Sequence, residues 1–115
     1  MIVEQRTYTC HPGKAGAYIK AYAAEGLAIQ RPILGNLVGY FTTDIGVLNQ
    51  VIHLWAYADL QDRSVRRAHL LADPGWQAYM VKVQPLVLEQ ENKILIPAPF
   101  SPWANGPAYA ASGAA

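Results

Sequence analysis

The chain has 115 residues, of which 52% are hydrophobic and 15% charged, and this composition is sufficient for the core of one domain. Its formal net charge of +1 gives no reason to expect nucleic acid or an anionic membrane surface as a partner, because both require clustered positive charge. Cys10 is the single cysteine, so an internal disulfide is excluded. The sequence shows neither a secretory signal nor an apolar run of about 20 residues, which predicts a soluble cytoplasmic protein.

The first half of the chain predicts two strands with one long helix between them. Residues 2–10 are expected to form a strand, and a helix is expected from about residue 14 to about residue 30. Arg31-Pro32 should end this helix, because the residue before a proline is disfavoured in helical geometry. Residues 34–43 predict a second strand, in which Gly39 indicates a bulge or a close neighbouring backbone.

Residues 51–58 form the strand with the most unusual side chains. Successive strand residues project to opposite faces. One face is aliphatic and consists of Ile52, Leu54, Ala56 and Ala58. The other is aromatic and polar and consists of Val51, His53, Trp55 and Tyr57. We expect the aliphatic set to face the helices and the other set to be exposed. Asp59 and Asp62 then predict the start of a helix, where unpaired amide groups and the helix dipole favour negative charge.

The second half continues with two helical segments and a last strand. Helices are expected over residues 60–72 and 76–84, on either side of Asp73-Pro74-Gly75, and a strand is expected within residues 88–96. Prolines become frequent after Pro97, and a proline lacks the donor that a helix or an inner strand needs. Phe100 and Trp103 favour docking of this segment, because burial of a large aromatic side chain gains ~1.5–3 kcal/mol. The domain is therefore predicted to span residues 1–103, with a disordered small-residue tail over residues 104–115.

The order of elements predicts an α+β fold, a ferredoxin-like βαββαβ protomer with an antiparallel sheet. Right-handed crossovers place the first and third strands at the centre of the sheet and the helices on one face. The other face is then left bare, and an exposed face rich in aromatic residues marks an interaction surface. Because two-fold dimers are the commonest oligomers, we expect a homodimer that forms through the sheet faces.

Six segments spread over residues 2–103 carry a family resemblance: Glu4-Gln-Arg-Thr-Tyr8, Pro12-Gly13, Leu37-Val-Gly-Tyr-Phe41, the stretch from Gly46 to Tyr57, Asp59-Leu60 with Arg63, and Asp73-Pro-Gly-Trp76. They resemble the NIPSNAP family, within the dimeric α/β-barrel superfamily. The resemblance implies a ferredoxin-like protomer and a sheet-to-sheet homodimer, but NIPSNAP proteins have no agreed catalytic activity. Related families on this fold include cofactor-independent quinol monooxygenases and haem-degrading oxygenases, and a shared fold alone does not establish function.

The predicted pairing of the first and third strands brings together a candidate ligand-binding set: Arg6, Tyr8, His53, Trp55 and Tyr57, with Arg63 from the following helix and Glu4 beside them. An imidazole, a guanidinium and two phenols in one place could bind a planar aromatic ligand. The same side chains could equally fill a core or pair across a dimer interface, where tyrosine, tryptophan and arginine are common. Arg63, Arg66 and Arg67 form the only basic cluster, which we interpret as a solvated helix face in preference to a site that binds phosphate or carboxylate.

Catalytic residues cannot be assigned, and the candidates are His53, Trp55 and His69. In the oxygenases of the superfamily, a tryptophan that ends the third strand is followed by a helical histidine before a Ser/Asp-Pro break, and Trp55, His69 and Asp73-Pro74 look similar. The spacing here is longer, and Arg6 and Thr7 stand where those enzymes place an asparagine, which argues against haem degradation. His69 could equally be a surface residue. Three histidines and one cysteine match no zinc pattern, so we expect neither a metal nor a cofactor.

Three functions remain open. The first is a homodimer that binds a hydrophobic or aromatic small molecule in a barrel or helix–sheet pocket. The second is a cofactor-independent monooxygenase that acts on an aromatic or quinol substrate. The third is a non-catalytic structural or interaction protein with a filled interior.

Overall fold

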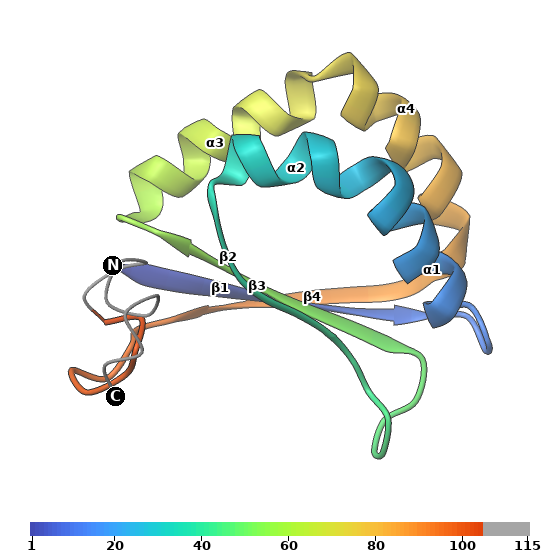
Figure 1. The fold of residues 1–115 in the computed structure, drawn as a ribbon, viewed down its shortest axis with the longest axis horizontal. Coiled ribbons are helices and arrows are strands. Elements are labelled where there is room, and N and C mark those ends of the chain that lie inside the picture. Colours follow the sequence, from blue (N-terminus) through green and yellow to red (C-terminus); the bar gives the residue numbers. More distant parts are fainter. Residues whose placement is uncertain (105–115) are drawn as a thin grey trace.

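The computed structural model describes residues 1–104 and shows one antiparallel sheet of four strands, covered on one face by helices (Figure 1). The strands follow the order β2-β3-β1-β4, so the first and third strands lie at the centre as predicted. This arrangement confirms the α+β, ferredoxin-like fold. Of the predicted tail, residues 105–115 lie outside the described part of the chain.

The elements correspond closely to those expected. The strands are β1 (Ile2–Cys10), β2 (Asn36–Thr42), β3 (Gln50–Tyr57) and β4 (Val87–Leu95). The helices are α1 (Ala15–Ala21), the π-helical turn η1 (Tyr22–Gly26), α2 (Leu27–Leu34), α3 (Leu60–Ala72), α4 (Pro74–Val83) and the short 3-10 helix η2 (Gln84–Leu86). The single long helix predicted in the first half is thus a continuous run of α1, η1 and α2. Among the described residues, no helix has both the length and the apolar character that crossing a bilayer requires.

The expected helix end at Arg31-Pro32 is wrong. Pro32 lies inside α2, which continues to Leu34 and stops at Gly35. The missing donor of the proline removes at most one bond near the end of the helix, and the complete burial of Leu34 offsets that loss. Gly35 has a φ of 93°, which side chains other than glycine rarely adopt, and its N–H donates to the Arg31 carbonyl at 2.8 Å.

Local signals predicted the start of α3 correctly. The Asp59 side chain accepts a hydrogen bond from the Asp62 N–H at 2.7 Å, and the Asp62 side chain accepts one from the Ala58 N–H at 3.0 Å. The first bond satisfies one of the amide groups that a helix start leaves unpaired, and the second ties the first turn of α3 to the residue before its N-cap. The bulge predicted at Gly39 is also present, because the pairing of β2 with β3 shifts between Leu37 and Gly39.

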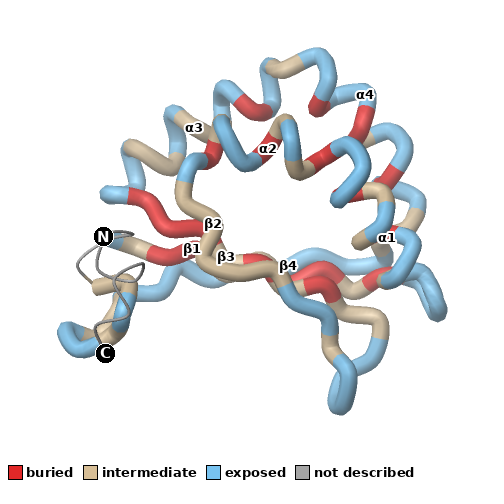
Figure 2. The backbone as a smooth tube through the Cα atoms, viewed as in Figure 1, coloured by how far each residue is buried: buried red, intermediate tan, exposed pale blue. Residues whose placement is uncertain are grey.

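The prediction for the two faces of β3 is wrong. His53, Trp55 and Tyr57 point toward the helices and are at most 1% exposed, whereas Ile52 and Leu54 lie half-buried on the opposite face. Figure 2 shows the buried residues gathered between the sheet and the inner sides of the helices. Both faces of this strand carry several large apolar side chains, so hydropathy alone could not choose between them. The large rings face inward because they can reach the helix layer and bury more area there.

The core between sheet and helices is therefore aromatic. Its largest members are Tyr8, Tyr18, Tyr22, Trp55, Tyr57, Trp76 and Tyr79. Tyr22 stacks on Tyr40 with ring centroids 4.4 Å apart. Gly26 permits this packing, since a Cβ at this position would lie 2.7 Å from the Tyr79 ring and 2.8 Å from the Tyr22 ring. Burial raises the pKa of the Tyr18, Tyr22 and Tyr79 hydroxyls, so the core contains neutral phenols.

The outer face of the sheet, which the helices leave uncovered, is aliphatic around Val3 and Leu54 and polar around Thr7 and Glu91. Val3, Val38 and Leu54 line a shallow groove on this face together with Leu95 of the edge strand. The segment that follows β4 runs back along the groove and contributes Pro97, Ser101 and Trp103 to its wall. Of the two aromatic residues expected to dock, Trp103 does so, whereas Phe100 is 83% exposed.

Candidate functional site

A buried carboxylate organises the helix-facing side of β1. Glu4 is fully buried, and its Oε2 accepts hydrogen bonds from Arg63 at 2.7 Å, Asn92 at 2.8 Å and Arg6 at 3.3 Å. The alternation of β1 places Glu4, Arg6 and Tyr8 on this side, beside the inward-facing residues of β3. One carboxylate thus joins β1, α3 and β4.

The charge on Glu4 is maintained by its partners. Burial alone raises the pKa of the carboxyl, but the hydrogen bonds from Arg63 and Asn92 and the positive charges of Arg6 and Arg63 outweigh burial and lower the pKa below its usual value. Glu4 is therefore an anion at neutral pH and anchors two guanidinium groups. Its three hydrogen-bond donors give it a structural role that joins β1, α3 and β4.

His53 is buried in a cage of aromatic rings. It stacks on Tyr40 at 4.6 Å and contacts Tyr8 edge-on at 4.9 Å. Its Nδ1 accepts a hydrogen bond from the Trp55 indole N–H at 2.7 Å, so the neutral ring carries its proton on Nε2. Burial and the nearby charge of Arg6 lower the His53 pKa to about 3. The lone pair is occupied by Trp55, and His53 is therefore not available as a base at neutral pH.

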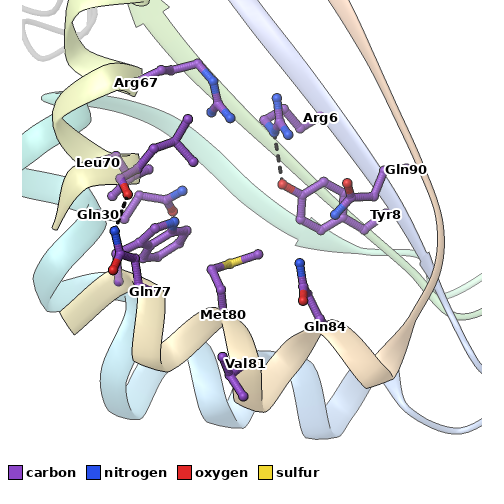
Figure 3. Close-up of a pocket in the computed structure, with 12 residues that line it drawn as sticks. Arg6, Tyr8, Gln30, Arg67, Leu70, Gln77, Met80, Val81, Gln84 and Gln90 are labelled. Atoms are coloured by element: carbon purple, nitrogen blue, oxygen red, sulfur yellow. Dashed lines mark hydrogen bonds between the residues drawn. The ribbon is translucent and has the colours of Figure 1, made fainter. Parts of the chain in front are cut away.

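A pocket of about 380 Å³ lies beside this cluster, between the edge formed by β1 and β4 and the helices α3 and α4 (Figure 3). Its polar end contains Arg6, Tyr8, Gln30 and Arg67. The remaining wall combines apolar side chains of α3 and α4, chiefly Leu70, Trp76 and Met80, with the three glutamines Gln77, Gln84 and Gln90. The volume is near the lower end of the ~300–1,000 Å³ found for small-molecule sites, and the mixture of apolar walls with a few polar groups is typical of them.

The two arginines of the pocket differ in their partners. Arg6 donates from Nε to the Tyr8 hydroxyl at 2.9 Å and also reaches Glu4. Arg67 forms no ion pair within residues 1–104. Burial and the neighbouring charge of Arg6 lower the pKa of the Arg67 guanidinium, but an arginine stays protonated at neutral pH. Figure 3 shows the Arg67 guanidinium pointing toward Arg6 across the pocket.

The structure brings together only part of the predicted ligand-binding set. Arg6 and Tyr8 line the pocket, while His53, Trp55 and Tyr57 lie buried and Arg63 holds Glu4. His69 is exposed on α3 and is not among the residues that line the pocket. The geometry therefore does not place His69 with Trp55 in one site, and a monooxygenase activity stays a prediction.

Sequence reasoning missed Arg67, Gln30 and the α4 residues of the pocket. Arg67 had been interpreted as part of a solvated helix face. A usable signal was present, because Arg63 and Arg67 are four residues apart and share one side of α3, and Arg63 on that side bonds to buried Glu4. The interpretation holds better for Arg66, which pairs with Asp62 on its own helix at 2.8 Å.

The antiparallel sheet, the single helical layer and the pocket between them define an α+β protein of ferredoxin-like type. Comparison with known proteins identifies it further. The NIPSNAP family model matches residues 3–102, so the chain belongs to the NIPSNAP family. It is 38% identical over 102 residues to human protein NipSnap homolog 2 and 34% identical over 94 residues to a NipSnap homolog of Dictyostelium discoideum. These matches cover 88% and 82% of this chain but only 35% and 41% of the two relatives.

Solved structures agree with this membership. An uncharacterized NIPSNAP-like domain protein from Burkholderia xenovorans superposes with a TM-score of 0.87 at 57% identity, covering 88% of each chain. A NIPSNAP family protein from Agrobacterium tumefaciens gives 0.86 at 53% identity and covers 88% of this chain and 96% of its own. A protein described as an antibiotic biosynthesis monooxygenase gives 0.59 at 9% identity, covering 86% of this chain and all of its own, and this likeness concerns the fold alone.

Proposed function

We propose that this NIPSNAP protein is a homodimer that binds a hydrophobic or aromatic small molecule in the pocket between the sheet and helices α3 and α4. The observation that carries the proposal is the pocket itself, in which Leu70, Trp76 and Met80 provide an apolar wall opposite a small group of polar side chains. Preformed apolar pockets with a few fixed polar groups are the usual form of small-molecule sites. The core beside it is filled with aromatic rings, so a ligand on the helix side of the sheet would bind in the pocket and not among the core side chains.

A neutral aromatic probe tests this proposal. N-phenyl-1-naphthylamine should bind the full chain with an increase in its fluorescence, and Met80→Trp should weaken binding at least about tenfold, because the larger ring occupies the pocket. Ala78→Trp is the matched control, since it adds the same ring at an exposed position of α4 that does not line the pocket. Equal probe affinity in the wild type and in Met80→Trp would place the ligand elsewhere and contradict the proposal.

The proposed dimer forms through the outer face of the sheet. Because His53, Trp55 and Tyr57 face the helices, the surface available for pairing is the aliphatic one around Val38, Ile52 and Leu54. Ile52 and Leu54 stay half-buried although the segment after β4 contributes to the groove on this face, and a partner would remove more of their apolar area from water. Two copies related by a two-fold axis would cover this face reciprocally.

Leu54→Glu is expected to convert the dimer to a monomer. The change places a carboxylate without a partner at the centre of each paired face, and we expect the dissociation constant to rise at least about a hundredfold. Sedimentation velocity over a range of protein concentrations measures the effect. Val65→Glu is the control, because Val65 is an exposed residue of α3 in the helix layer. A wild-type protein that is monomeric at high concentration would contradict the dimer, and an unchanged dimer in Leu54→Glu would contradict this interface.

A further inference from the structure

The polar end of the pocket has an excess of positive charge. Arg6 from β1 and Arg67 from α3 both line it, and none of the described residues that line the pocket is acidic. The carboxylate bonded to this group is Glu4, which is shared between Arg6 and Arg63 and does not reach Arg67. Three guanidinium groups therefore accompany one carboxylate. Two like charges brought together at a partly desolvated site are costly unless an anion joins them.

The neutral groups at the same end are also arranged as donors. The Gln30 Oε1 accepts a hydrogen bond from the Tyr22 hydroxyl at 2.6 Å, which fixes the amide orientation and leaves its NH₂ group to donate. The Tyr8 hydroxyl accepts a hydrogen bond from Arg6 Nε, so its own proton is free to be donated. Figure 3 shows both side chains at the pocket beside the two arginines. A ligand at this end must supply acceptors.

We propose that the pocket recognises a monocarboxylate with an apolar or aromatic body, and that its carboxylate lies between Arg6 and Arg67. The inference rests on the proposed function and adds the chemical class of the ligand. Planar guanidinium groups match a carboxylate well, and charge-assisted hydrogen bonds to it are roughly twice as strong as neutral ones. Arg6 already commits Nε to Tyr8 and Nη1 to Glu4, which leaves few donors for a multiply charged group. Leu70, Trp76 and Met80 would contact the body of the ligand.

A pair of isosteric probes separates charge recognition from apolar binding. We expect 2-naphthoate to bind the full chain at least about tenfold more tightly than 2-naphthamide, measured by isothermal titration calorimetry at low salt. Arg67→Gln should reduce this preference more than it reduces the affinity for the amide, because Arg6 is then the only one of the two arginines left to bind the carboxylate. Arg31→Gln is the matched control, because Arg31 is an exposed arginine of α2 that does not line the pocket, and it should retain the preference. Thermal unfolding of both variants verifies that the fold is intact.

The outcomes distinguish the two proposals. Equal affinity of the wild type for naphthoate and naphthamide would overturn carboxylate recognition while supporting a neutral apolar pocket. A naphthoate preference that is unchanged in Arg67→Gln, or that disappears in Arg31→Gln, would overturn the assignment to Arg67. Absence of binding by both naphthyl probes together with N-phenyl-1-naphthylamine would overturn the proposed function as well. A preference that depends on Arg67 and weakens with added salt supports the inference.

Discussion

Replacing His53 with glutamine is expected to remove most of the acid sensitivity of folding between pH 6.5 and pH 4.5. The His53 pKa is lowered to about 3 in the folded protein from an ordinary value of 6.5, because of burial and the charge of Arg6. Between these two values the unfolded chain binds a proton that the folded chain does not. The free energy of unfolding therefore falls as the pH is lowered through this window, by roughly 4–5 kcal/mol in all and roughly 2–3 kcal/mol down to pH 4.5.

Urea unfolding at several pH values measures the effect. The groups that face His53 are Glu4, Arg6 and Tyr8 from β1, Tyr40 from β2 and Arg67 from α3, and Glu4 has a pKa lowered from 4.5, so it titrates below the chosen window. We expect a nearly flat pH dependence for His53→Gln above pH 4.5. His69→Gln is the control and should keep the wild-type slope, because His69 is exposed on α3. A wild-type slope in His53→Gln would show that this ring takes up its proton over the same pH range in the folded and unfolded states, which contradicts a lowered pKa.

The sequence was sufficient for the fold but not for the faces of the sheet. Element order and right-handed crossovers place β1 and β3 at the centre of the sheet without knowledge of any contact. The start of α3 could also be predicted, because Asp59 and Asp62 accept hydrogen bonds from amide groups within four residues in the sequence. Which face of β3 packs against the helices could not be predicted, because Ile52 and Leu54 are at least as apolar as Trp55 and Tyr57 on the other face. The rings of β3 face inward because they pack there against aromatic side chains of the helices, at Tyr18, Tyr22 and Tyr79.

The part of the candidate site that could be predicted is the part formed by two paired strands, β1 and β3. Pairing of β1 with β3 places Arg6 opposite His53, and alternation along a strand predicts that proximity. The pocket is lined by residues far apart in the chain, such as Arg6 of β1, Arg67 of α3 and Gln90 of β4. The rotation of α3 about its own axis decides whether Arg67 faces solvent or the sheet. That rotation is set by packing and not by the charge pattern of the helix.

Replacing Glu4 with glutamine is expected to lower the free energy of unfolding by about 3–5 kcal/mol at pH 7. The Oε2 atom accepts three hydrogen bonds, two of them from guanidinium groups, while Oε1 is buried without a hydrogen-bond partner among the described residues. In the glutamine variant, the amide NH₂ group replaces one of the two carboxylate oxygens. At the position of Oε2 it would face the three donors, and at the position of Oε1 it would have no acceptor. It would also leave the charges of Arg6 and Arg63 without their counter-charge.

Urea unfolding at pH 7 compares Glu4→Gln with a matched surface change. Glu25→Gln removes the same charge from an exposed ion pair with Lys82 and should cost less than about 1 kcal/mol. A loss of similar size in both variants would mean that the buried pairs contribute no more than a surface pair. The Glu4 pKa is lowered in the folded state, so its contribution is present above pH 4.5 and is lost as the pH falls through the lowered value. Glu4→Gln should therefore differ less from the wild type at pH 3 than at pH 7.

A double variant separates loss of charge balance from loss of packing. In Glu4→Gln combined with Arg63→Met, one of the two uncompensated guanidinium groups is absent, although the apolar length of its side chain is retained. We expect this double variant to be more stable than the sum of the two single losses predicts, by at least about 1 kcal/mol. Strict additivity would mean that Glu4 acts by packing alone. Arg6 would still lack its partner in the double variant, so full recovery of wild-type stability is not expected.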